Sequence, residues 1–192
     1  VLAAGRSRRM APHNKLLITG PSGKSIIARV VDNVLSSAAR PVLVVTGHQA
    51  DEIERILAGR PVRFVHAADY AQGLSASLKA GVAAVPAECV GVIVCLGDMP
   101  LVTGSMIDRL LAQFDPDEGR AIVLPNFRGK QGNPMLWGRR FFAEISTISG
   151  DVGARFLLAR HTEQMVEVEI ADEAVLRDVD TPEALAAMPK QF

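Results

Sequence analysis

The sequence predicts an α/β protein in which a mostly parallel sheet lies between two layers of helices. Runs rich in valine and isoleucine alternate along the chain with longer segments whose apolar residues recur every three or four positions. One run, at 90–98, is so uniformly apolar that we expect both of its faces to be covered, as in a central parallel strand. Regular alternation of strand and helix favours this three-layer α/β/α sandwich.

The first two thirds of the chain supply the alternating elements. Strands are expected where apolar, β-branched runs stand between turn residues, at 41–47, 62–67, 90–98 and 120–127. Helices are expected where apolar residues recur every three or four positions, at 24–39, 50–59, 75–86 and 103–114. In a sheet of this kind ligands bind at the carboxyl ends of the strands, so the loops that follow the strands are the places to look for a site.

After residue 128 the alternation loosens. A Gly-rich turn comes first, followed by two short helices, two short strands and a final helix, expected at 138–145, 151–161, 164–170, 175–180 and from Thr181 onward. Thr181 suits the N-cap of that last helix. Trp137 is expected in the core. No repeat or linker interrupts the chain, so 1–192 is expected to form one domain, although a first residue other than methionine leaves a longer natural chain open.

Composition excludes several classes of function. The 192 residues carry 21 basic and 21 acidic side chains, so no overall charge attracts nucleic acid or an anionic membrane. No window is long enough for a membrane span. The two cysteines, Cys89 and Cys95, form no disulfide framework, and a reducing, cytoplasmic setting is expected.

The opening stretch, VLAAGRSRRM, places small residues and then arginines after a short apolar run. Ala3, Ala4 and Gly5 let a ligand approach the backbone closely. Positive charge follows at Arg6, Arg8 and Arg9, and Lys15 adds a further cation. Phosphate is the expected partner of this loop, and a solvated basic loop is the alternative.

A second signal lies in the stretch VIVCLGDMPLVT. Its apolar strand ends in Gly97 and Asp98, and a carboxylate at a strand end suits Mg2+. Bracing of a turn by Asp98 is the alternative. A D-x-D pattern is missing here, which makes a glycosyltransferase a weak interpretation.

Weaker candidates occupy other turns. Ser75 and Ser77 lie at the expected start of a helix. Their hydroxyl groups are expected to bind a base edge or a phosphate, and capping of the helix is the alternative. Asp151 is a possible helix cap. Gly132 and Asn133 lie in a Gly-rich turn, and Asp178 and Asp180 suit strand-end turns.

Several familiar motifs are absent. GPSGKS at 20–25 lacks the first glycine of a P-loop, because Ile18 holds that position, and is expected to be a turn that opens the next helix. The histidines have no zinc-ligand spacing. Neither G-x-S-x-G nor GxGxxG occurs.

Together these motifs resemble the nucleotidyltransferases of the molybdopterin dinucleotide type, the MobA-like family. VLAAGRSRRM with NKLL resembles their signature loop and LGDMP their metal-binding strand end, and GLSASLKAG, GNPMLW, GDVGAR and DVDTPEAL follow in order. LAAG and GLSASL are more similar to the cytidylyltransferase branch than to the guanylyltransferase branch. The resemblance implies a Rossmann-like sheet of the nucleotide-diphospho-sugar transferase type.

The resemblance also implies roles for individual residues. The residues implied to line the nucleotide are Leu2, Ala3, Ala4, Gly5 and Arg6, with Ser75 and Ser77 near the base. Arg9, Lys15 and Asp98 are the implied catalytic residues, the first two on the triphosphate. Mg2+ is implied at Asp98 and Asp151. The residues implied to face the acceptor are Gly132, Asn133, Asp178 and Asp180. The alternative role implied for the segments around Asn133, Asp151 and Asp178–Asp180 is to complete the metal site.

The activity implied is transfer of CMP from CTP to the terminal phosphate of molybdopterin or molybdenum cofactor. GMP transfer from GTP and transfer to a sugar or polyol phosphate are alternatives in the same fold. A non-catalytic module that delivers the cofactor is the alternative from another class. A molybdoenzyme or a maturation chaperone is a possible protein partner.

Overall fold

The computed structural model describes residues 1–10, 12–20 and 23–188. The α-helices are α1 (Ile26–Leu35), α2 (Ala50–Ile56), α3 (Leu74–Ala83), α4 (Gly104–Leu111), α5 (Phe142–Thr147) and α6 (Pro182–Ala186). The strands are β1 (Val42–Thr46), β2 (Val62–His66), β3 (Gly91–Val94), β4 (Ile122–Phe127), β5 (Lys130–Gln131), β6 (Met135–Gly138) and β7 (Met165–Glu169). Every helix and strand expected before residue 128 is present, and each is shorter overall than expected.

The strands follow the order β2, β1, β3, β6, β4, β7, and Leu2 lies between β1 and β3. Leu2 forms parallel bridges to Val45 in β1 and to Leu96 after β3. β1 pairs with β2 and β4 with β7 in parallel, whereas β6 runs antiparallel to both β3 and β4. All strands except β6 and the short β5 therefore point the same way, which confirms the mostly parallel sheet.

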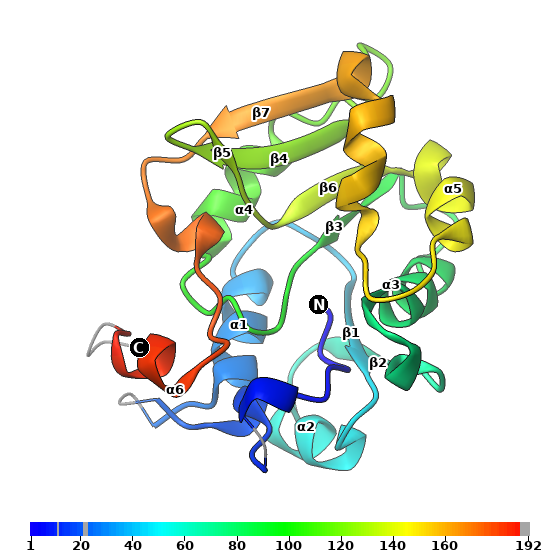
Figure 1. Ribbon diagram of the computed structural model, residues 1–192. Helices are drawn as coiled ribbons and strands as arrows, with labels where there is room; N and C mark the ends of the chain where they lie inside the picture. Colours follow the sequence, from blue (N-terminus) through cyan, green and yellow to red (C-terminus); the bar gives the residue numbers. More distant parts are fainter. Residues whose placement is uncertain (11, 21–22, 189–192) are drawn as a thin grey trace.

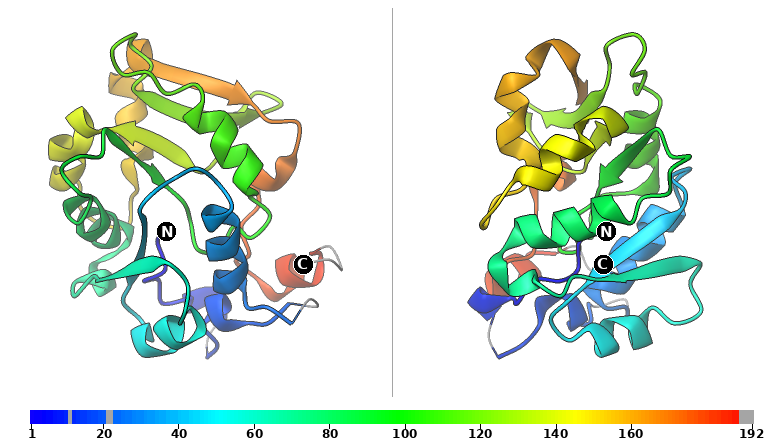
Figure 2. Two further views of the ribbon diagram at one scale, coloured as in Figure 1. Left: turned by 180° about the vertical axis from the view of Figure 1, so that it is seen from behind. Right: turned by 90° about the vertical axis from the view of Figure 1, so that its right-hand side faces the viewer.

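Helices cover both faces of the sheet. On one face α3, α5 and the 3-10 helix η5 (Ala154–Arg160) pack against β4 and β6 through a cluster that includes Leu78, Ile145 and Trp137. On the other face α1, α2 and α4 contribute Ile27, Ile53 and Ile107. Figure 1 shows η5 crossing in front of the strands, and the view from behind shows α4 over the opposite face (Figure 2).

β6 is the principal element that the sequence analysis missed. Its residues Met135–Gly138 follow the Gly-Asn-Pro turn, and all of them are buried. Trp137 is 1% exposed and packs edge to face on Phe141, as expected for a core residue. A strand of four residues behind a turn has too few positions to show a period.

β3 is less covered than the sequence predicts. Each of its residues is only half-buried. Val1–Ala3 forms hydrogen bonds with Val45 in β1 and with Cys95 and Gly97 after β3, and an apolar cavity of about 520 Å³ lies next to Val1, between the earlier residues of β1 and β3. Val1 N donates to Leu43 O at 2.7 Å.

Two other expectations need correction. The strand expected at 175–180 is instead a 3-10 turn, η7 (Glu173–Leu176), followed by an extended segment. Asp172 accepts a hydrogen bond from Ala174 N and thereby starts this turn. The helix expected at 151–161 is present as the 3-10 helix η5 rather than as an α-helix.

The predictions for the turns that open α1 and α6 are confirmed. Residues 21 and 22 of the GPSGKS turn lie outside the described residues, but Ser25 caps α1 by accepting from Ala28 N at 3.3 Å. Lys24 is on the surface, where it pairs with Asp32 at 2.8 Å. Thr181 caps α6 as predicted.

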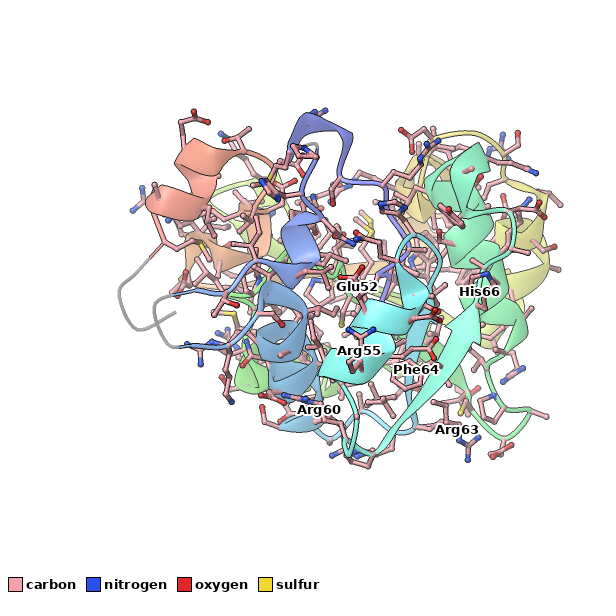
Figure 3. All side chains as sticks on the ribbon, turned by 90° about the horizontal axis from the view of Figure 1, so that it is seen from below. Glu52, Arg55, Arg60, Arg63, Phe64 and His66 are labelled. Carbon is pink, nitrogen blue, oxygen red and sulfur yellow. The ribbon has the colours of Figure 1, made fainter. Side chains whose placement is uncertain are left out.

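β2 forms an outer edge of the sheet beside α2. Figure 3 shows Arg63, Phe64 and His66 along this strand, with Arg55 nearby on α2. Phe64 is 38% exposed although it belongs to a strand. In the described part of the chain, no helix is both long and apolar enough to cross a membrane.

We expect Gly97→Ala to loosen the N-terminal segment. A Cβ at Gly97 would lie 2.7 Å from Leu2 O, the atom to which Gly97 N now donates. The substitution should lower the free energy of unfolding by about 1–3 kcal/mol, measured by urea denaturation. Gly5→Ala is the control, because a Cβ there meets no atom within 4 Å. Equal effects of the two substitutions would contradict this account of Gly97.

Asp32 should make the free energy of unfolding fall as the pH is lowered into the acid range. Burial alone would raise the pKa of Asp32, but the Arg60 and Lys24 partners outweigh burial and lower it. Its contribution is therefore present above the usual carboxyl pKa of about 4 and is lost as the pH falls through the lowered value. Asp32→Asn should cost about 1 kcal/mol near neutral pH. This difference should shrink in acid, whereas Asp117→Asn, at an exposed residue, should show no such trend.

Candidate active site

A polar cavity of about 610 Å³ opens where the N-terminal segment and the β3 segment end. One wall is the loop after Leu2, the floor carries Lys15, Asp98 and Asp180, and the far wall is the start of α3 with the turn before it. The cavity therefore lies at the carboxyl edge of the parallel strands, where the architecture predicts a ligand.

Asp98 and Asp180 line this cavity, and the exposed Asp178 lies beside them. Asp98, Asp178 and Asp180 each offer an oxygen, and these oxygens all lie within 4.8 Å of one another; we call these residues the carboxylate cluster. Val179 N donates to Asp98 O at 2.9 Å, which holds the two segments together. Figure 1 shows the orange-red segment before α6 passing beside the green loop after β3.

Lys15 balances this negative charge. Its Nζ lies 2.5 Å from Asp98 Oδ2 and also pairs with Asp180 Oδ1. Burial alone would lower the pKa of Lys15, but the two carboxylates outweigh burial and raise it. Among the ion pairs of the described residues, none involves Asp178. Burial, followed by the charges of Asp180 and Asp98, raises its pKa.

Ser7 and Asn14 fix the backbone that presents Lys15, and the sequence analysis assigned neither. Asn14 Oδ1 accepts from Leu16 N at 3.1 Å and from Ser7 Oγ at 3.2 Å. Lys15 N donates to Ser7 Oγ at 3.1 Å. An asparagine directly before the short helix η2 (Lys15–Leu17) is a capping pattern that could have identified Asn14.

The small residues of the opening stretch have different surroundings. Leu2, Ala4 and Gly5 line the cavity, and their contact with a nucleotide stays a prediction. Ala3 is 1% exposed and packs in the core near Leu16 and Ile27. Its small side chain therefore serves packing.

The arginines of the opening stretch differ in their contacts. Arg6 and Arg9 line the cavity, and Arg9 Nη1 lies 2.6 Å from Asp180 Oδ2. The side chain of Arg8 is outside the described part of the structure. The carboxylate partner that the local sequence lacks is thus supplied from near the other end of the chain.

The far wall contains residues that the sequence analysis did not select. Tyr70 and Gln72 line it together with Gly73 and Ser77. Gly73 has φ 117°, and a Cβ there would lie 2.8 Å from Gly150 O, so glycine is required for the 150–151 turn to pack on α3. Ser75 is 2% exposed.

α3 is capped by Asp151 and not by a serine. Its N-cap residue is Gly73, and Asp151 Oδ1 accepts from Leu74 N at 3.1 Å. Asp151 lines the cavity but is not part of the carboxylate cluster. Its role as a metal ligand stays a prediction, and capping is the role that this geometry supports.

Gly132 and Asn133 lie beside the segment that leads to the carboxylate cluster. Asn133 N donates to Val175 O at 2.8 Å, and a Cβ at Gly132 would lie 2.4 Å from that same oxygen. Arg155 donates to Gly132 O at 3.0 Å. Asp178 and Asp180, predicted to face the acceptor, are brought to Asp98 instead of to this loop; contact of any of these residues with an acceptor stays a prediction.

The carboxylate cluster fits a divalent cation. Asp98 Oδ1 is buried and has no hydrogen-bond partner among the residues that the structure describes. A buried carboxylate oxygen without a partner is costly unless it binds a cation or another donor. Oxygen donors of this kind suit Mg2+ or Mn2+. Asp98, Asp178 and Asp180 are therefore the residues that could hold such an ion.

We expect Asp151→Ala to destabilise the protein by about 0.5–2 kcal/mol, because Leu74 N loses its acceptor. Asp151→Asn should retain stability, since an amide oxygen can accept the same bond. Thermal and urea unfolding measure this difference. If Asp151→Asn instead weakens Mn2+ binding while leaving stability unchanged, Asp151 is a metal ligand, as the resemblance implies.

Comparison with known proteins agrees with this geometry. The model of the MobA-like NTP transferase domain matches residues 1–165. The molybdenum cofactor cytidylyltransferase of Escherichia coli strain K12 is 29% identical over 194 residues, which cover 100% of this chain and 95% of that protein. The nicotine blue oxidoreductase of Paenarthrobacter nicotinovorans is 26% identical over 190 residues, covering 96% and 92%.

A solved structure is also similar over almost its whole length. The nucleotidyl transferase from Methanothermobacter thermautotroptrophicus superposes with a TM-score of 0.84 at 26% identity, and the match covers 96% of this chain and 92% of that one. The strand order, the cavity at the strand ends and these similarities agree. The chain belongs to the MobA-like NTP transferase family and is a nucleotidyltransferase with the Rossmann-like fold of the nucleotide-diphospho-sugar transferases.

Proposed function

We propose that this chain transfers CMP from CTP to the terminal phosphate of a molybdopterin-type acceptor and releases pyrophosphate. The observation that carries the proposal is the carboxylate cluster around the Lys15 ammonium at the floor of the polar cavity. Carboxylates that can hold a divalent cation, next to cations that can face phosphate, are what nucleotidyl transfer requires. Similarity to the E. coli molybdenum cofactor cytidylyltransferase supports the choice of nucleotide and acceptor.

The proposed reaction is a single displacement at the α-phosphorus of the nucleoside triphosphate. A terminal phosphate oxygen of the acceptor forms the new P–O bond. The bond between the α-phosphorus and the α,β-bridging oxygen breaks, and pyrophosphate leaves with the electron pair. Such a transfer depends on positioning and on neutralisation of charge, so no protein nucleophile is required.

Each proposed role follows from a contact in the cavity. Lys15 and Arg9 are proposed to bind the triphosphate, and the carboxylate cluster is proposed to hold Mg2+. The turn fixed by Ser7 and Asn14 keeps the Lys15 backbone in place while its flexible side chain reaches the phosphates. When bound, Mg2+ would withdraw electron density from the phosphate oxygens and neutralise part of their charge.

The walls of the cavity suggest where the rest of the substrates bind. The far wall, with Tyr70, Gln72 and Ser77, is proposed to face the base. The loop at Gly132 and Asn133 is proposed to face the acceptor, because it adjoins the segment that ends in the carboxylate cluster.

Other activities remain as alternatives in the same fold. GMP transfer from GTP and transfer to a sugar or polyol phosphate would keep the same chemistry. Delivery of the cofactor to a molybdoenzyme or a maturation chaperone would need binding without catalysis. The oxidoreductase relative widens the range of activities at this level of identity. A cytoplasmic location and a protein partner stay predictions from the sequence.

Pyrophosphate release tests the proposal. The purified protein is assayed with CTP, GTP, ATP and UTP, each with Mg2+, with and without molybdenum cofactor. We expect release that requires both CTP and the cofactor. Asp98→Asn should lower the turnover number by a factor on the order of 10² or more, because the cation loses a ligand. Asp117→Asn, a change of the same kind at an exposed residue, should retain full turnover.

Each other outcome selects an alternative. A preference for GTP would retain the mechanism and change the nucleotide. Release with a sugar phosphate or polyol phosphate in place of the cofactor would change the acceptor. Tight binding of CTP and cofactor without any release would favour the delivery module, and no binding of any nucleotide would overturn the proposal.

A further inference from the structure

Lys15 is bound by the same carboxylates that could hold a metal ion. Its Nζ contacts Asp98 Oδ2 at 2.5 Å and pairs with Asp180 Oδ1, and both aspartates belong to the carboxylate cluster. The side chains of Lys15, Asp98 and Asp180 are only 14%, 20% and 29% exposed. Water therefore screens these charges weakly, and an ammonium and a divalent cation would compete for the same lone pairs.

The contacts of Lys15 separate a fixed backbone from a side chain that is free to change partner. Lys15 N is held by Ser7 Oγ, and the adjacent Leu16 N is held by Asn14. The ammonium itself is held only by Asp98 and Asp180 among the contacts found in the described residues. A lysine on a flexible four-carbon stem can turn from these carboxylates to another anion without movement of the turn.

We propose that Lys15 is an internal counter-ion, which occupies the carboxylate cluster in the ligand-free protein and gives up Asp98 and Asp180 to a divalent cation. Its ammonium is then free for the phosphates of the nucleotide. Metal binding and nucleotide binding are thereby coupled through one side chain. The nucleotide half of this inference rests on the proposed function, whereas the competition between Lys15 and the metal ion does not.

Mn2+ binding in the absence of any nucleotide tests the competition. Free Mn2+ is measured by electron paramagnetic resonance during titration of the wild type, Lys15→Met and Lys24→Met. Removal of one positive charge in contact with two carboxylates should tighten Mn2+ binding by about tenfold or more. Lys24→Met is the matched control, because Lys24 pairs with Asp32 on the surface and should leave Mn2+ affinity unchanged.

A second substitution locates the ion. Lys15→Met combined with Asp180→Asn should lose most of the gain, because the metal then loses a carboxylate of the cluster. Equal Mn2+ affinity of the wild type and Lys15→Met would overturn the proposal, as would a gain that persists in the double variant. The proposal would also be overturned if neither the wild type nor Lys15→Met binds Mn2+ at millimolar concentration.

A measurement on the wild type covers the case in which Lys15→Met does not fold. Protein labelled with ¹³C at the lysine ε-carbon is titrated with diamagnetic Mg2+, without nucleotide. The Lys15 resonance should shift with saturation while the Lys24 resonance stays fixed, and an unchanged Lys15 resonance would count against the exchange. Neither experiment uses nucleotidyl transfer, so failure of the proposed function and failure of this inference are distinguishable.

Discussion

The structure around the site depends on one electrostatic constraint, the need for a cation among three carboxylates. Asp98, Asp178 and Asp180 bring their oxygens within 4.8 Å of one another, and like charges this close repel one another. The Lys15 ammonium relieves this repulsion for Asp98 and Asp180. It thereby joins three segments that are distant in sequence: the opening loop, the turn after β3 and the segment before α6.

Backbone contacts give this constraint its geometry. Gly97 lets Leu2 approach the β3 segment, and Val179 N holds the last segment against Asp98 O. Ser7 and Asn14 then set the position from which Lys15 reaches the cluster. The charged side chains therefore meet because parallel strands end at one edge of the sheet, and a few hydrogen bonds hold the connecting loops there.

The sequence predicted most of the fold and part of the site, for identifiable reasons. The first strands and helices have periods long enough to detect, whereas β6 is a four-residue strand behind a turn. The opening arginines and Asp98 stood out because they follow apolar runs, whereas the roles of Arg9 and Lys15 on a triphosphate were implied by the family resemblance. The grouping of Asp178 and Asp180 with Asp98 could not be predicted from spacing, since about eighty residues separate them and only tertiary contacts unite them. Asp151 was open to two interpretations, and the hydrogen bond from Leu74 N supports the capping one.

The balance of charge at the floor of the cavity bears on how an anionic substrate can bind. Lys15 and Arg9 are the cations expected to face a triphosphate, yet both are held by Asp180 in the ligand-free protein. Three carboxylates against these two cations leave one negative charge when all five groups are ionised. A triphosphate alone would therefore meet a site without excess positive charge, and only an added cation reverses this balance. Electrostatics thus favours substrate and divalent cation binding together, because each removes the repulsion that opposes the other.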